Sequence, residues 1–101
     1  MQVTLSQLAT VTLDGTAQRI HATQGTLAQS VVIQADDGNA GKVVVGDSAV
    51  AVANGVELAA GEALTIKPGD VNGTAVEIDL YDIFVRGAAA DTVRISYIKR
   101  K

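Results

Sequence analysis

The stretch Thr92-Val93-Arg94-Ile95-Ser96-Tyr97-Ile98 alternates polar and apolar residues, which places Val93, Ile95 and Tyr97 on one side of an extended chain. A period of two is typical of a β-strand with one buried face. The alternation recurs along the sequence, and no window of about eleven residues keeps the spacing of an amphipathic helix. An almost entirely β protein is therefore predicted. The predicted strands cover residues 2–6, 10–13, 17–23, 29–35, 42–45, 63–67, 74–80, 83–86 and 92–98.

Turn-forming residues separate these strands. Asp14-Gly15 is the strongest short hairpin signal, because a type I′ turn needs positive φ angles that Asp-Gly adopts at low cost. Residues 36–41 predict a longer hairpin loop between two valine-rich strands. At Tyr81-Asp82 the apolar alternation slips by one residue, which predicts a bulge or a tight corner.

The size of the chain limits the fold. Its 101 residues, 48% of them apolar, correspond to one domain. About eight or nine short strands without a helix are typical of a β-sandwich or a small barrel. We therefore predict an all-β fold, a single compact β-sandwich over residues 1–101. Periodicity leaves a jelly-roll-like and an immunoglobulin-like strand order both open.

The composition excludes several classes of protein. Cysteine is absent, so the chain has no disulfide, no thiolate metal site and no cysteine nucleophile. No apolar run approaches the roughly 18 to 20 residues of a membrane-spanning helix. The first residues also lack the pattern of a secretory signal. We therefore expect no membrane association, and action or assembly where the protein is made.

Charge is distributed unevenly along the sequence. Residues 1–92 hold all eleven acids and four bases, a net charge of −7, whereas residues 93–101 hold four bases and no acid. An acidic body repels nucleic acid, and a short basic tail is too small to follow a phosphate backbone. No nucleic-acid partner is therefore predicted. The tail is either a solvated terminus or a basic hook for an acidic partner surface.

Residue patterns for catalysis are weak. His21 falls on the polar side of a predicted strand and has no nucleophile in a recognisable motif near it. Asp36, Asp37 and Asn39 could hold Ca²⁺, but EF-hand spacing is missing and a solvated turn explains the same residues. We predict that the protein is not an enzyme and has no catalytic residue, no metal site and no cofactor.

From Gln29 onward, the order of strand and turn signals resembles that of small virion proteins of tailed bacteriophages. The closest likeness is to the β-sandwich or jelly-roll decoration (cement) proteins on the outside of the capsid. The resemblance spans residues 29–97, about two thirds of the chain, and rests on the signals at residues 29–35, 38–46, 54–58, 61–66, 82–87 and 91–97.

The resemblance implies a structural virion protein that is made in the host cytoplasm and located on the capsid exterior. It implies binding to the major capsid protein, bridging of neighbouring capsid subunits to stabilise the head, and a homo-oligomer, dimer or trimer. The alternatives are a neck or tail connector, a head-fibre domain, and a carbohydrate- or receptor-binding module that would stack sugars on Tyr81, Phe84 or Tyr97.

The ends of the chain are the candidate partner contacts, because terminal strands most easily extend a partner's sheet. The alternative is that both are ordinary edge strands. The candidate contact residues are Gln2, Val3, Thr4, Leu5, Arg94, Lys99, Arg100 and Lys101.

Overall fold

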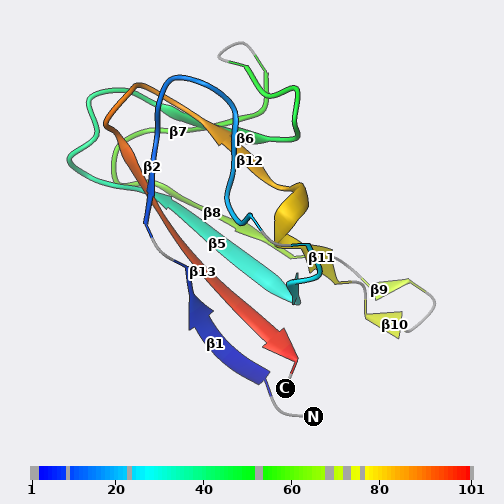
Figure 1. Ribbon diagram of the computed structural model, residues 1–101. Helices are drawn as coiled ribbons and strands as arrows, with labels where there is room; N and C mark the ends of the chain where they lie inside the picture. Colours follow the sequence, from blue (N-terminus) through cyan, green and yellow to red (C-terminus); the bar gives the residue numbers. More distant parts are fainter. Residues whose placement is uncertain are drawn as a thin grey trace.

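The computed structural model describes residues 3–8, 10–22, 24–51, 54–67, 70–71, 74–75 and 77–100. In this part of the chain there are thirteen strand segments and one short 3-10 helix. Figure 1 shows the longest strands, β5 and β13, side by side, with β1 along the other edge of β13. The all-β prediction is confirmed.

Two antiparallel sheets hold nine of the strand segments, and we call them sheet A and sheet B. Sheet A consists, in spatial order, of β1 (Val3–Gln7) and β2 (Val11–Thr12) along one edge of β13 (Thr92–Arg100), followed by β5 (Ser30–Ala35) and β8 (Ala63–Ile66). Sheet B consists of β3 (Gln18–Arg19), β12 (Phe84–Arg86), β6 (Val43–Gly46) and β7 (Val56–Leu58).

The order of the strands is that of a jelly roll. When β1 and β2 are counted as two halves of one edge strand, the first strand lies beside the last, and β3 lies beside β12, the next to last. In the same nested way β5 pairs with β8 and β6 pairs with β7. Such a rolled ribbon of eight strands in two sheets defines the jelly-roll architecture. The topology thus decides between the two strand orders that periodicity left open.

The core lies between sheets A and B. Paired strand residues share a face, so β13 and β5 bury their side chains in matched pairs. These pairs are Val93 with Ala35, Ile95 with Ile33, and Tyr97 with Val31. Sheet B buries Val43, Val45, Leu58 and Val85 against them. Small and medium side chains therefore form most of the core.

Two small pairs of strands lie outside the main sheets. They are β4 (Leu27–Ala28) with β11 (Ile78–Asp79), and β9 (Asp70–Val71) with β10 (Thr74–Ala75). The predicted strands do not include β4, β7 and β9, which have too few residues to alternate visibly. One strand was predicted over 74–80, where the structure has β10, β11 and the beginning of a 3-10 helix.

The slip of alternation at Tyr81-Asp82 corresponds to that 3-10 helix, Leu80–Asp82. The Asp79 carboxylate caps it by accepting a hydrogen bond from the Tyr81 N–H at 3.0 Å. Leu80, the first residue of this turn, and Ile83, which follows it, are both buried. A tight corner therefore restores the inward facing, as one of the two predicted alternatives required.

Both predicted hairpins are wrong. Asp14-Gly15 connects β2 in sheet A to β3 in sheet B, and residues 36–41 connect β5 in sheet A to β6 in sheet B. Gly15 has the expected positive φ of 89°. However, the Gln18 side chain, and no strand ladder, closes this turn by bonding the Asp14 N–H and the Thr12 carbonyl. Asp14 does not have the positive φ that a type I′ turn needs at both central residues, so the residues mark a turn but specify neither its type nor which strands pair.

Candidate interaction surface

The outer face of sheet A is the broadest surface that the strands present in register. Its residues alternate with the buried ones on each strand and are aligned across the sheet by the pairing register. The described side chains that point outward from sheet A are Leu5, Gln7, Thr12, Ser30, Val32, Gln34, Ala63, Thr65, Thr92, Arg94, Ser96 and Ile98. This set contains one charged residue, Arg94, and no acid, although the chain has eleven acids.

Apolar groups are exposed on this face. Leu5 is 70% exposed and lies directly opposite Ile98 in the β1–β13 pairing. Val32 is 36% exposed and lies opposite Ser96 on β13 and Thr65 on β8. Leu5, Ile98 and Val32 thus place aliphatic side chains on three neighbouring strands. A face with little charge and some exposed aliphatic area has the composition found at the centre of protein interfaces.

A shallow polar hollow lies on the same face. It has a volume of about 340 Å³, and Gln7, Gln34 and Arg94 line it together with residues of β1, β5 and β13. A second hollow of about 280 Å³ shares Gln34 and Arg94 and extends to Asp36 and Asp37. Arg94 therefore stands between two recesses, with its strand partner Gln34 across from it.

The register brings the two candidate contact segments together. Val3 pairs with Arg100, Thr4 with Lys99 and Leu5 with Ile98. Arg94 is separate, because it lies six residues before Arg100, or about 20 Å along β13. The structure describes the backbone alone for Val3, Thr4, Lys99 and Arg100, and the proposed contacts Gln2 and Lys101 lie outside the described residues.

A polar cluster lies at the end of the sandwich where β13 begins, which we call the loop end. The opposite end, where β13 finishes with Lys99 and Arg100, is the basic end. The buried Asp91 carboxylate accepts hydrogen bonds from the N–H groups of Ala40 and Gly41 at 2.9 and 3.0 Å. Asn39 bonds both main-chain groups of Thr92 at 2.9 Å. These bonds fasten the β5–β6 connection to the start of β13, across two sheets.

The carboxylate of Asp36 belongs to this cluster. The Thr92 hydroxyl donates to it at 2.9 Å, and the Gly38 N–H donates at 3.4 Å. These donors, with a smaller contribution from the positive charge of Arg94, lower the pKa of Asp36 below its ordinary value. Asp36 and Asn39 thus have structural partners in the loop. In the described part of the chain, no three His, Cys, Asp or Glu residues are grouped to hold a metal ion.

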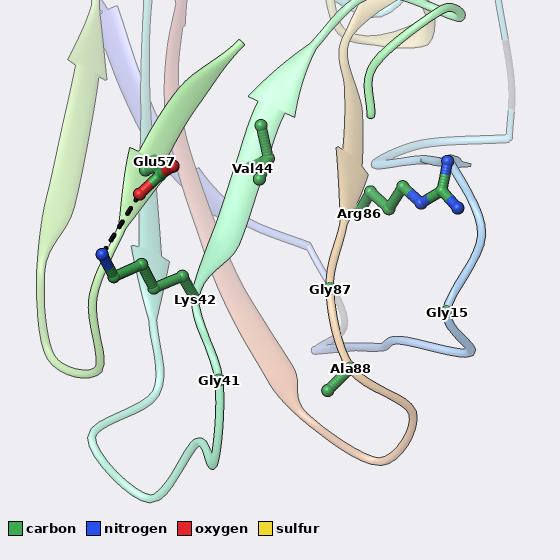
Figure 2. A pocket seen from close by; sticks show the side chains of 8 residues that line it. All are labelled: Gly15, Gly41, Lys42, Val44, Glu57, Arg86, Gly87 and Ala88. Atoms are coloured by element: carbon green, nitrogen blue, oxygen red, sulfur yellow. Dashed lines mark ion pairs between the residues drawn. The ribbon is translucent and has the colours of Figure 1, made fainter. Parts of the chain in front are cut away.

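A groove of about 390 Å³ lies on the outer face of sheet B. Figure 2 shows Lys42 and Glu57 on one side of it, joined by an ion pair of 3.3 Å, and Arg86 directed toward the connection that carries Gly15. The floor includes Val44, which is 3% exposed. None of the eight lining residues is a histidine, serine, threonine or cysteine, and the titratable side chains in the lining are Lys42, Glu57 and Arg86.

The three aromatic side chains are already engaged. Tyr97 is buried between the sheets at 8% exposure. The Arg19 guanidinium lies 3.6 Å from the centre of the Tyr81 ring and 4.6 Å from that of Phe84, and it donates to the Tyr81 carbonyl at 2.7 Å. These contacts are of the cation–π type. They hold both rings against Arg19, which lies opposite Phe84 in the β3–β12 pairing.

His21 follows β3 and is half-buried. Its predicted strand position is wrong, because the β3 ladder ends at Arg19. The outward residues Val32, Gln34, Thr65 and Ser96 are not among the contact residues predicted from the sequence. Their alternation with buried neighbours was a usable signal, but only the pairing of β5 with both β13 and β8 shows that they form one surface.

The fold defines the class of protein as a single jelly-roll β-sandwich. A scan against protein-family models, a comparison with curated proteins and a comparison with solved structures each returned no match to this chain. Over the described residues, no helix has the length and apolar character needed to cross a membrane.

Proposed function

We propose that this protein is a structural virion protein that binds the outer surface of a bacteriophage capsid and bridges neighbouring capsid subunits. The outer face of sheet A is its docking surface. The proposal joins the resemblance of the sequence to phage decoration proteins with the jelly-roll order, an architecture used by viral capsid proteins and by lectins.

The choice of the outer face of sheet A as the docking surface rests on one observation. In a chain with eleven acids and a net charge of −3, the described outward residues of sheet A include no acid. Because burying an unpaired charge is costly, a docking surface is expected to exclude charge from its centre. Leu5 and Val32 supply exposed aliphatic contacts, and Arg94 supplies one cation for an acidic or carbonyl group of the partner.

The mechanism is mechanical. A module that contacts two capsid subunits at once adds its binding free energy to the work needed to separate them. Many copies on one shell multiply a modest contribution per site. No bond is made or broken, so the chain needs no catalytic residue or cofactor for this role.

The carbohydrate-binding alternative has less support. It requires an aromatic ring with an open face beside a cleft, and Tyr97 is buried while Arg19 covers Tyr81 and Phe84. A neck or tail connector remains the second structural candidate from the sequence. It predicts a ring of fixed copy number, which native mass spectrometry would detect.

Co-sedimentation with capsids of the encoding phage, purified without this protein, tests the proposal. We expect saturable binding at a copy number set by capsid symmetry, and better survival of the decorated shells on heating. Val32→Glu, on the docking surface, should weaken binding about tenfold or more. Val56→Glu is the matched control, because Val56 is 48% exposed on β7 in sheet B. Absence of binding by the wild-type chain, or equal loss in both variants, would overturn the proposal.

A further inference from the structure

The strand β1 is an edge strand without the usual protection. Its residues, Val3–Gln7, include no charge and no proline, and the first charged residue of the chain is Asp14. Within the described residues, β1 pairs with β13 on one side, and no strand occupies its other side. Soluble proteins normally protect such edges with charges, prolines or bulges, because free main-chain groups invite another strand.

The rest of this edge is interrupted. β2 continues along β13, but its register differs from that of β1. Gln7 pairs with Ser96, and Val11 pairs with Val93. The edge side therefore advances by four residues where β13 advances by three. A one-residue shift of this kind twists an edge away from further pairing. The part of the edge open to a partner is therefore β1.

The hydrogen bonds fix which groups of β1 point outward. The Leu8 N–H donates to the Ile95 carbonyl at 3.1 Å, so Leu8 faces β13. In an antiparallel ladder the facing alternates with each residue. Ser6 and Thr4 therefore also face β13, and Val3, Leu5 and Gln7 present their N–H and C=O groups to the free edge. These three positions are symmetrical about Leu5.

We propose that this edge pairs with β1 of a second copy of the chain, antiparallel and about a two-fold axis at Leu5. Leu5 then lies opposite the second copy's Leu5, and Val3 lies opposite Gln7 in both directions. Each of these pairs exchanges two main-chain bonds, about six in all. The two copies of sheet A become one continuous sheet, closed by symmetry so that no further copy can add there.

The outer face supports a second copy as the occupant. Paired residues share a face, so Leu5 of both copies would lie side by side, each flanked by its own Ile98. This arrangement covers the most exposed of the large hydrophobic side chains in the described chain, Leu5 at 70%. It also places both outer faces of sheet A on the same side of the dimer.

Charge complementarity selects the antiparallel direction. The loop end of sheet A carries the exposed acids Asp14, Asp37 and Glu62. At the opposite end Lys67 follows β8, and Lys99 and Arg100 are the last two residues of β13. Antiparallel pairing of β1 turns the basic end of each copy toward the acidic end of the other. Parallel pairing would place the two basic ends together, where they repel.

The other edges of the two main sheets are less suitable. β8 is flanked by Glu62 and Lys67, β7 has Glu57 at its centre, and β3 has two residues, one of them Arg19. Charges at these places oppose the addition of a strand. Self-pairing through β1 does not depend on the capsid role, and it would give that role a docking surface shared by two copies.

Light scattering and native mass spectrometry of the full chain test the inference. We expect twice the 10.4 kDa of one chain, with a concentration-dependent return to monomer. Leu5→Lys sets two cations against each other at the axis and should raise the dimer dissociation constant about tenfold or more. Gln7→Pro removes an outward N–H that β13 does not use, and should act in the same direction. Thr65→Lys, an exposed residue on the opposite edge strand, is the matched control and should remain dimeric.

Amide hydrogen exchange checks the register directly. At high concentration the N–H groups of Leu5 and Gln7 should be protected, and Leu5→Lys should remove protection at position 7 while Ser6 stays protected. A monomer at all concentrations, a larger ring, or a dimer indifferent to both Leu5→Lys and Gln7→Pro would overturn the inference. A monomer that binds capsids would contradict this inference alone, and a dimer that does not bind them would contradict the proposed function alone.

Discussion

The side chain of Asn39 pairs with the main chain of Thr92 as a neighbouring strand residue would. Its Oδ1 accepts the Thr92 N–H at 2.9 Å, and its Nδ2 donates to the Thr92 carbonyl at 2.9 Å. The pairing lies just beyond the last residue of β5, next to the Asp36 N–H that also donates to the Thr92 carbonyl at 3.2 Å. One side chain therefore links the β5–β6 connection to the first residue of β13.

Replacement of this side chain should destabilise the fold. Asn39→Ala leaves the partly buried Thr92 N–H without a partner and removes one of the two hydrogen bonds to the Thr92 carbonyl, which still accepts the Asp36 N–H at 3.2 Å. The free energy of unfolding should therefore fall by about 1–2 kcal/mol. Urea denaturation followed by circular dichroism measures the change. Gln24→Ala, at an exposed turn residue, is the control and should stay within about 0.5 kcal/mol of wild type. Equal effects at both positions would contradict the bridging role of Asn39.

Gly87 is predicted to be intolerant of a side chain. A Cβ there would lie 2.6 Å from Cδ1 of Leu13 and 3.3 Å from the Lys42 carbonyl oxygen. Leu13 is 2% exposed and has little room to move, so Gly87→Ala should cost about 1–3 kcal/mol. A Cβ at Gly38 would have no atom within 4 Å, so Gly38→Ala should be neutral or slightly stabilising. Thermal unfolding of the two variants compares them, and a tolerated Gly87→Ala would show that Leu13 can shift.

The sequence was sufficient to predict the strands that form the core. β5 and β13 alternate over six and nine residues, long enough for the period of two to be unmistakable, and the predicted inward residues are buried. β4 and β7 have two and three residues, and no period can be read over that length. Their strand geometry depends on neighbours that are distant in sequence, Ile78 and Val43 among others.

The pairing of the strands could not be predicted from short stretches of sequence. Asp14-Gly15 was predicted to form a hairpin, but it joins two sheets, because the Gln18 side chain satisfies the turn while β2 pairs with β13. The same limit applied to the surface. The contact segments at the two ends of the sequence were identified separately, and only the β1–β13 register shows that they are neighbours.

Ala90 offers a test of backbone strain at the loop end. Its φ of 76° makes it the one non-glycine residue with a positive φ among the described residues. An L side chain in this region costs about 1–2 kcal/mol, and glycine gives back about 0.5–1 kcal/mol through the greater entropy of its unfolded chain. Ala90→Gly should therefore stabilise the protein by about 0.5–1 kcal/mol. Ala89→Gly, one residue earlier, should destabilise it slightly, and the same sign for both would contradict this account.

Lowering the pH should reduce the free energy of unfolding, and part of this reduction should depend on the Thr92 hydroxyl. Hydrogen bonds from the Thr92 hydroxyl and the Gly38 N–H lower the pKa of Asp36 in the folded state. A lowered carboxyl pKa contributes stability above the unfolded value of about 3.9, and this stability is lost as the pH falls through the folded pKa.

Thr92→Val removes the hydroxyl while keeping the shape of the side chain, so the pKa of Asp36 should return toward its ordinary value. The variant should be less stable than wild type at pH 7, and the difference should shrink below about pH 4, because a protonated Asp36 no longer favours its donors. Unfolding at a series of pH values from 7 to about 2 measures this convergence, with Thr65→Val as an exposed control on the same sheet. A difference between wild type and Thr92→Val that stays constant over this range would show that the hydroxyl acts through packing and not through the charge of Asp36.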